Sequence, residues 1–279
     1  MEKTILVPFD FSEVSKEIVR IANDWGRRTD AKLYLLHSSP NSFFIGSHFR
    51  PEDRLKHITD FLEDINDLTS HEFLTPVGKA YINVITEAKK INPDLIIMAA
   101  HDHTIVGRML LGSNTDYIVH HATCPVYVYK LAKKKLNNII LLPLDFSDIN
   151  LKVIKMADEW AQEIGAELAF VYVGTTPEFV HLNAEFNFDW VDLEDEAVKK
   201  IQTERFEKYV NSLEIKSKFS KHMAFGRPGN EIVSLQMTIG ANLIMMAAHS
   251  HTILERMTTG SVTDHILHHV HCPVYVYKH

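Results

Sequence analysis

Short apolar runs alternate with longer amphipathic stretches along this chain. The runs are rich in Ile, Val and Leu, as expected for buried strands, and in the first half they cover Ile5–Pro8, Leu33–His37, Leu95–Ala99 and Val126–Tyr129. Helices are predicted over Ser12–Arg28, Arg50–Leu68, Ile82–Ile91 and, in the second half, Glu194–Leu213. The alternation predicts an α/β fold with a parallel sheet and helices on both of its faces.

The pattern occurs twice in the chain. Asp10 in "ILVPFDFSE" matches Asp145 in "ILLPLDFSD" at a distance of 135 residues, whereas later landmarks such as Pro125 and Pro273 are 148 residues apart. The second copy therefore contains thirteen additional residues after its second strand. A duplication of this size predicts two tandem domains rather than a short-period solenoid. We place the domains at residues 1–130 and 138–279, with Leu131–Asn137 as a short basic linker.

The additional residues lie in an acidic and aromatic stretch that contains Phe186, Phe188 and Trp190. Apolar side chains on a loop beside a pocket can form a lid or a surface for a protein partner. The same loop can instead pack on the helix that follows it. Both interpretations stay open at this point.

Amino-acid composition and net charge exclude several classes of protein. The 279 residues are 46% hydrophobic, enough for two cores, and the formal net charge of −7 lacks the basic excess that a general nucleic-acid-binding protein needs. No apolar run approaches the length of a membrane span, and the N-terminus lacks the pattern of a signal peptide. Two cysteines cannot form a disulfide framework. We therefore expect a cytoplasmic protein without a nucleic-acid or membrane partner.

The last strand of each copy has the same sequence, Val-Tyr-Val-Tyr, at Val126–Tyr129 and Val274–Tyr277. Pro125 and Pro273 can begin a strand, but they cannot donate a ladder hydrogen bond. An end strand with an exposed edge favours association unless another strand pairs with it. We predict that the two end strands form an antiparallel ladder, which makes the chain an intramolecular pseudo-dimer. The alternative is that each is an ordinary strand inside its own sheet.

Candidate chemistry lies at the carboxyl ends of the strands, where an open α/β sheet binds its ligands. Asp10 and Asp145 follow the first strand of each copy, just before a helix. The pairs Gly112-Ser113 and Gly260-Ser261 begin a later helix, whose backbone N–H groups favour a phosphate. Each feature also has a structural explanation, because small polar residues cap helices and acidic residues stabilise a first turn.

The two starts, the late Gly-Ser helix and the closing segments "HHATCPVYVY" and "HHVHCPVYVY" together resemble a tandem member of the universal stress protein family, the UspA-like proteins. The resemblance covers nearly the whole chain. It implies two adenine-nucleotide-hydrolase-like, Rossmann-like domains, each a five-stranded parallel sheet with helices on both faces. It also implies dimers through the last strands, in line with the pairing predicted above.

One branch of this family binds ATP through a loop of the form Gly, two residues, Gly, nine residues, Gly, then Ser or Thr. The corresponding positions are Ala99, Asp102, Gly112 and Ser113 in the first copy and Ala247, Ser250, Gly260 and Ser261 in the second. The first two glycines are missing in both copies, which restricts the approach of the backbone to a phosphate. Asp102 would add a repelling carboxylate, so the second copy is the better candidate for a nucleotide.

The resemblance assigns further residues to a nucleotide. Asp145 would contact adenosine or the metal, with Asp10 as its counterpart in the first copy. Val173, at the end of the second strand, would lie against adenine, where the first copy has Ser38. Mg²⁺ would arrive with the phosphates rather than occupy a protein cage. Without a Walker loop, a nucleophile elbow or a catalytic triad, any ATPase activity is expected to be weak.

The chain has 17 histidines, several of them in pairs that recur in both copies. His101 and His103 match His249 and His251. Imidazole is a common ligand of Zn²⁺, so a metal site that involves His103 or His251 is one hypothesis. Structural or solvated histidines are the simpler explanation, since no Cys-x-x-Cys motif supplies further ligands.

These observations predict a universal stress protein with a binding or regulatory role in a stress response and with degenerate nucleotide loops, rather than an efficient enzyme. Two alternatives remain, an ATP-binding protein whose second domain has weak ATPase activity, and a metal-responsive interaction module. Beyond the internal pair, a homo-oligomer and a protein partner are further expectations.

Overall fold

The structure, a computed structural model, describes residues 3–39, 51–65, 67–100, 112–132, 136–174, 195–248 and 261–278. The chain forms two compact units. The first contains Met1–Leu131 together with the C-terminal residues Tyr275–His279, and the second contains Ala132–His249 and Gly260–Val274. The two units correspond to the two repeats, except that Tyr275–His279, the end of the second repeat, groups with the first unit. Each domain is defined below by its repeat, so β10 (Val274–Tyr277) belongs to the second.

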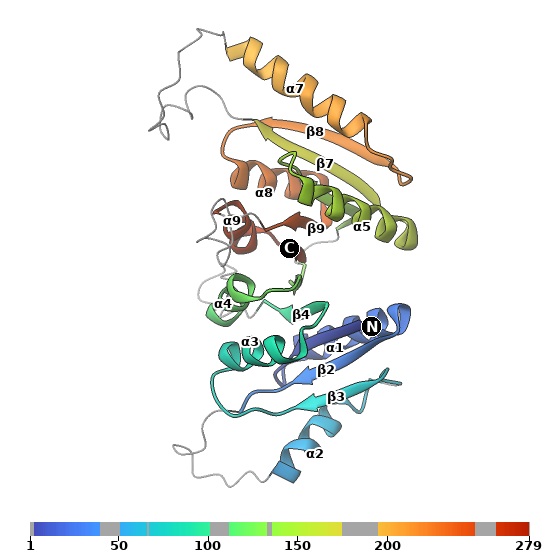
Figure 1. Cartoon of the computed structure of the whole chain (residues 1–279), viewed down its shortest axis with the longest axis vertical. Helices are drawn as coiled ribbons and strands as arrows, with labels where there is room; N and C mark the ends of the chain where they lie inside the picture. The colour runs from blue at the N-terminus through green and yellow to red at the C-terminus, as the bar shows by residue number, and fades with distance from the viewer. Residues whose placement is uncertain are drawn as a thin grey trace. The chain divides into compact units, whose positions relative to one another are not determined.

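The first domain is built around a sheet with the strand order β3-β2-β1-β4-β5 (Figure 1). Its strands are β1 (Lys3–Pro8), β2 (Ala31–Leu36), β3 (His71–Leu74), β4 (Leu95–Ala99) and β5 (Val126–Tyr129). Its helices are α1 (Glu13–Thr29), α2 (Pro51–Leu62), α3 (Ala80–Ile91) and α4 (Ser113–His121). All four strand pairs are parallel, and Ile5 of β1 lies between Leu33 of β2 and Leu95 of β4.

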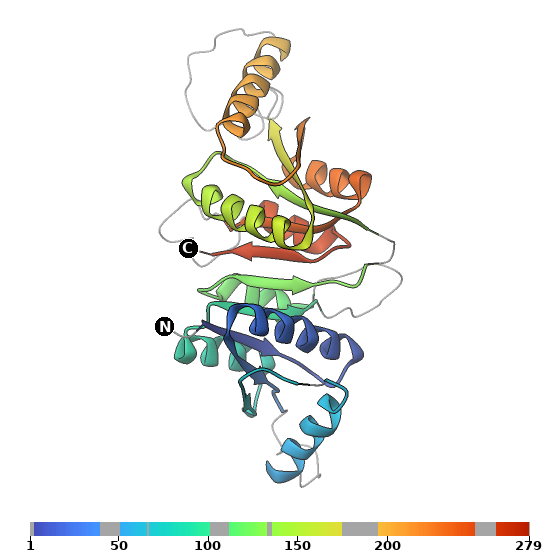
Figure 2. The same ribbon diagram turned by 90° about the vertical axis from the view of Figure 1, so that its right-hand side faces the viewer.

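The second domain repeats this topology with the order β10-β9-β6-β7-β8. Its strands are β6 (Asn137–Pro143), β7 (Glu167–Gly174), β8 (Phe219–Phe225), β9 (Ala241–Ala247) and β10 (Val274–Tyr277). Its helices are α5 (Asp148–Ile164), α7 (Asp195–Asn211), α8 (Pro228–Ile239) and α9 (Ser261–His269). Figure 2 shows α5 and α8 on opposite sides of these strands. The predicted fold class, with helices on both faces of each sheet, is confirmed.

Burial on both faces explains the apolar runs in the sequence. Every residue of β4 is buried, because α1 covers one face of the first sheet, and α3 and α4 pack together on the other. In the second domain β9 is buried in the same way except at Asn242. Strands of this kind lose the alternation of polar and apolar residues that a half-exposed strand has.

Two of the helix boundaries depend on local hydrogen bonds. Ser12 is the N-cap of α1, and its Oγ accepts from the backbone N–H of Ser15 at 3.2 Å. Ser147 has the same N-cap position in α5, but its side chain makes no cap bond there, and its hydroxyl donates to Asp145 at 2.6 Å. The predicted helix Arg50–Leu68 ends earlier, at Leu62. The chain leaves it through a turn in which the N–H of Ile65 donates to the carbonyl of Leu62 at 2.8 Å.

Gly78 and Gly226 follow β3 and β8 and are 148 residues apart, the same repeat distance as Pro125 and Pro273. Their φ angles are 128° and 147°, values that residues with a side chain rarely adopt. The glycine therefore recurs because the same sharp exit from the third strand is built twice.

The stretch with Phe186, Phe188 and Trp190 lies outside the described residues. Pairing of the two end strands stays a prediction.

None of the described helices has the length and apolar character needed to cross a membrane. Cys124 and Cys272 are buried and form no disulfide, as expected for small core residues.

Candidate functional site

The carboxyl edge of each sheet contains a point at which the strand order reverses. In the first domain this point lies between β1 and β4, and in the second between β6 and β9. Ligands of open α/β sheets bind outside such a point, because the loops that leave the two strands diverge there. The turns with Asp10 and Asp145 follow β1 and β6, so the fold places both aspartates where the sequence predicted them.

The carboxylate of Asp10 is oriented by the turn into α1. Its Oδ1 accepts from the N–H of Ser12 at 2.9 Å and from the hydroxyl of Ser15 at 2.7 Å. The hydroxyl of Ser15 accepts in turn from the N–H of Asp10 at 3.0 Å. Ser15 is buried and Asp10 is half-buried, so the aspartate is tied to the first turn of the helix.

The carboxylate of Asp145 has the same arrangement with one different partner. Its Oδ1 accepts from the N–H of Ser147 at 3.0 Å, from the hydroxyl of Ser147 and from the side-chain amide of Asn150. Asn150 is buried, whereas Asp145 is exposed. The second domain therefore presents a fixed carboxylate to solvent at the point where the strand order reverses.

The start of α4 joins this edge in the first domain. Gly112 is the N-cap of the helix with φ −65° and ψ 145°, and Ser113, its first residue, is exposed. Thr115 is buried, and its Oγ1 donates to the carbonyl of Ala99 at 3.1 Å. This bond fixes the first turn of α4 to the end of β4.

The corresponding loop of the second domain is described at its two ends. Ala247 ends β9 and is buried, and Ser261 begins α9 and is exposed. The predicted loop positions Ser250 and Gly260, like Asp102 of the first domain, lie outside the described residues. Their roles stay predictions.

The end of the second strand differs between the domains. Val173 is only 9% exposed, and it precedes Gly174, the last residue of β7. A Cβ atom on Gly174 would lie 2.2 Å from Oε1 of Gln202 and 2.7 Å from the ring of Phe225, so α7 and β8 close around this strand end. In the first domain Ser38 is half-buried and accepts from Asn83 at 3.2 Å. Among the predicted residues described in the second domain, Asp145 and Ser261 are the exposed ones.

The sequence model of the universal stress protein family matches residues 1–130 and 137–278, one match for each repeat. This chain belongs to the universal stress protein family. Universal stress protein MJ0531 of Methanocaldococcus jannaschii is 35% identical to it over 144 residues, which make up 50% of this chain and 81% of that protein. Universal stress protein Mb2028c of Mycobacterium bovis is 24% identical over 208 residues, 73% of this chain and 66% of that protein.

Solved structures of universal stress proteins have the same fold over nearly the full chain. One from Archaeoglobus fulgidus superimposes with a TM-score of 0.68 at 20% identity, over 99% of this chain and 98% of its own. A putative universal stress protein from Pseudomonas aeruginosa has a TM-score of 0.70 at 16% identity, over 99% and 93% of the two chains. The tandem arrangement is therefore shared with other members of the family.

An aromatic cluster that the sequence analysis missed supports the aspartate turn of this universal stress protein. In the first domain Phe11, the residue after Asp10, is 47% exposed. The centroid of its ring lies 4.5 Å from that of His37, 5.4 Å from that of Phe61 and 6.4 Å from that of His57. The turn is thus packed against the end of β2 and against α2.

The second domain builds the same cluster with different side chains. The ring of Phe146 lies 4.5 Å from Tyr172 and 5.1 Å from Tyr209, and the guanidinium of Arg205 lies 4.8 Å from its centroid. Burial, together with the negative charges of Asp145 and Asp148, raises the pKa of Tyr209. The repeat itself could have revealed the cluster, because each position is separated from its counterpart by one of the two repeat distances.

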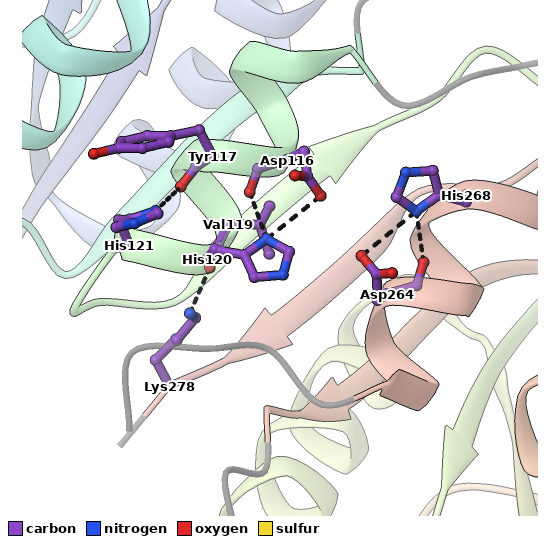
Figure 3. A network of polar contacts seen from close by, with 8 residues as sticks. All are labelled: Asp116, Tyr117, Val119, His120, His121, Asp264, His268 and Lys278. Carbon is purple, nitrogen blue, oxygen red and sulfur yellow. Dashed lines mark hydrogen bonds and ion pairs between the residues drawn. The ribbon is translucent and has the colours of Figure 1, made fainter. Parts of the chain in front are cut away.

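Histidines near the ends of α4 and α9 form a repeated contact, drawn in Figure 3. Nδ1 of His120 donates to the carbonyl of Asp116 at 2.8 Å and lies 3.4 Å from its carboxylate. His268 and Asp264 repeat this geometry at 2.8 Å and 3.6 Å. The histidines of the earlier metal hypothesis, His101, His103, His249 and His251, lie outside the described residues.

Proposed function

We propose that this universal stress protein works by binding rather than by efficient catalysis, as a cytoplasmic regulatory protein whose second domain binds ATP. The observation that supports the proposal most is the Asp145 turn. Its carboxylate is exposed at the reversal of strand order and is fixed by Ser147 and Asn150. Ser261 is exposed at the first residue of α9, whose N-terminus begins at the same edge.

The chemical groups at this edge are of the kinds that bind Mg²⁺ and the phosphates of a nucleotide. Carboxylate oxygen suits Mg²⁺, and the first N–H groups of a helix attract phosphate. Asp264 adds a negative charge to the first turn of α9, but its carboxylate lies 3.6 Å from Nδ1 of His268. Bound Mg²⁺ would supply positive charge to the phosphates. No described residue is assigned as a general base, so hydrolysis would be slow.

Thermal melting with and without ATP and Mg²⁺ tests the proposal. A ligand that binds only the folded state raises its stability, and we expect millimolar ATP to raise the melting temperature by about 3 °C or more. Asp145→Asn should abolish most of this shift, whereas the matched change Asp10→Asn in the first domain should preserve it. Ser250→Asp, which introduces the acidic residue of the first loop, should also abolish it. No shift in the wild type would refute the nucleotide proposal.

We also propose that the two domains pair within one molecule through their last strands. Both strands have the sequence Val-Tyr-Val-Tyr, and each ends the strand order of its own domain. The grouping of Tyr275–His279 with Met1–Leu131 in one compact unit supports this pairing. An edge of this kind would otherwise be free to associate with other chains.

Proline substitutions in the last strand should separate the two domains. Val274→Pro with Val276→Pro removes N–H donors from the strand, so we expect a larger radius of gyration in small-angle X-ray scattering. Lys221→Pro is the matched control, because it changes β8 at the other edge of the second sheet. Circular dichroism checks that both variants keep their helices. An unchanged radius in the double variant would contradict the pairing.

A further inference from the structure

Three imidazoles lie within two turns of α9 in the second domain, at His265, His268 and His269. The rings of His265 and His269, four residues apart, are stacked with centroids 4.0 Å apart and planes at 16°. Residues at this spacing are neighbours on one face of a helix. The two rings therefore form a pair on the surface of a single helix.

A hydrogen bond determines which ring nitrogen of His269 can bind a metal. Nδ1 of His269 donates to the backbone carbonyl of His265 at 2.7 Å, which leaves its Nε2 with a lone pair. Histidines that bind metals usually donate their second nitrogen to a carbonyl or carboxylate in this way. Within the part of the second domain that the structure describes, no hydrogen bond engages a ring nitrogen of His265.

The surroundings of His265 suit a metal ligand, because the ring packs closely against α8. The ring also has a fixed position, since a Cβ atom on Gly229 of α8 would lie 2.7 Å from its Cδ2. A positioned imidazole that has no hydrogen-bond partner among the described residues is a suitable ligand for a divalent transition metal.

We propose that His265 and His269 of α9 chelate a divalent transition-metal ion of the Zn²⁺ class on the surface of the second domain. Bonds of about 2.0–2.1 Å in tetrahedral geometry place two nitrogens roughly 3.4 Å apart. The rings are stacked with centroids 4.0 Å apart, so the exposed ring of His269 must turn out of the stack to bring its nitrogen to an ion that His265 also binds. Water completes the coordination of such an open surface site.

The first domain contains a matched pair with a single imidazole. Tyr117 and His121 of α4 are stacked with centroids 3.8 Å apart and planes at 13°. Nδ1 of His121 donates to the carbonyl of Tyr117 at 2.8 Å, as His269 does to His265. The chain thus shows that tyrosine can replace the first histidine of this pair without loss of the stack.

Titration of the full chain with Zn²⁺ by isothermal calorimetry tests the proposal. His265→Tyr should remove about one bound ion per chain or weaken it by about tenfold or more, because one of two ligands is lost. Tyr117→His in the first domain should add a site of comparable affinity. Circular dichroism and melting without metal establish that each variant is folded.

A second variant keeps the test independent of packing around His265. His269 is exposed, so His269→Gln should preserve the fold and lose the same ion. The chain has 17 histidines, and some of them can bind Zn²⁺ at other sites. The number of ions bound at those sites should be the same in all variants. If wild type, His265→Tyr and His269→Gln bind Zn²⁺ with the same stoichiometry and affinity, the site does not exist.

Discussion

Replacement of Asp158 by alanine is expected to lower the free energy of unfolding of the second domain by about 2 to 4 kcal/mol. Asp158 lies on α5 and is only 7% exposed. Its carboxylate accepts from the N–H of Ser217 at 2.9 Å and from that of Lys216 at 3.2 Å, and the hydroxyl of Ser217 donates to its carbonyl. Alanine would leave the two N–H groups that lead into β8 without their acceptor.

The pKa of Asp158 predicts how this contribution depends on pH. Burial raises the pKa, but hydrogen bonds from Ser217 and Lys216 outweigh it, so the pKa is lowered from 3.8. A carboxyl with a lowered pKa stabilises the fold fully above its unfolded pKa and loses this contribution as pH falls through the folded value. The difference between wild type and Asp158→Ala should therefore be constant near pH 7 and shrink below about pH 4.

The first domain supplies the control for this prediction. Asn23 has the corresponding position on α1, where Oδ1 accepts from the N–H of Thr69 at 2.8 Å and Nδ2 donates to the carbonyl of Asp67 at 3.3 Å. Asp158→Asn should thus retain part of the interaction and destabilise by about half as much or less. Urea denaturation at pH 7 measures both variants. Equal stability of wild type and Asp158→Ala would show that the contact does not hold α5 to β8.

Alkaline pH is expected to stabilise the wild-type protein relative to Lys278→Met, by about 2 to 3 kcal/mol between pH 7.5 and pH 10.5. Lys278 belongs to the same compact unit as α4, and its Nζ donates to the carbonyl of Val119 in the last turn of that helix (Figure 3). Helix carbonyls in a last turn have no partner within the helix, which makes them acceptors for a lysine. The contact therefore places a half-buried ammonium group against the end of α4.

The sign of this prediction follows from the lowered pKa. Burial lowers the pKa of Lys278 to about 8, although Cys124 opposes the shift, while the unfolded chain has a value near 10.5. Between these values the unfolded state holds a proton that the folded state has released, so stability rises with pH. Methionine has a similar length and does not titrate, so the variant lacks this pH-dependent contribution to the free energy of unfolding.

Urea denaturation of both proteins at pH 7.5, 9 and 10.5 measures the difference. Other groups titrate over the same range in both proteins, and the comparison cancels their contribution. Parallel stability curves for wild type and Lys278→Met would contradict the burial of a charged Lys278. A difference that grows with pH would support docking of the C-terminal residues on α4.

The sheet was predictable because its signal is local. A strand covered on both faces must be apolar throughout, and the predicted runs Leu95–Ala99 and Val126–Tyr129 coincide with β4 and β5. The turn with Asp145 was predictable for a similar reason, since its main hydrogen bonds join residues no more than five positions apart. Less local features were predicted less well, such as the end of α2, which lies at Leu62 rather than at Leu68.

The aromatic cluster around Phe11 shows what pattern analysis could not supply. Phe11 and Phe61 are fifty positions apart, and their contact depends on where α2 lies on the sheet. The amphipathic pattern of α2 indicates which face is apolar, but not which residue of that face meets the turn. In the second domain Phe146 makes the corresponding contacts with Tyr209 and Arg205. The arrangement of the cluster is therefore the same in both domains, although the side chains differ.

By itself, the sequence determined the duplication, the α/β class, the strands and the carboxyl-edge positions of Asp10 and Asp145. Periodicity and short-range turn geometry carry that information. Only the tertiary structure decided that Asp145 is exposed while Asp10 is half-buried and that Val173 lies at a closed strand end. These properties depend on side chains from distant segments that pack to fixed volumes, and packing of this kind has no period along a chain.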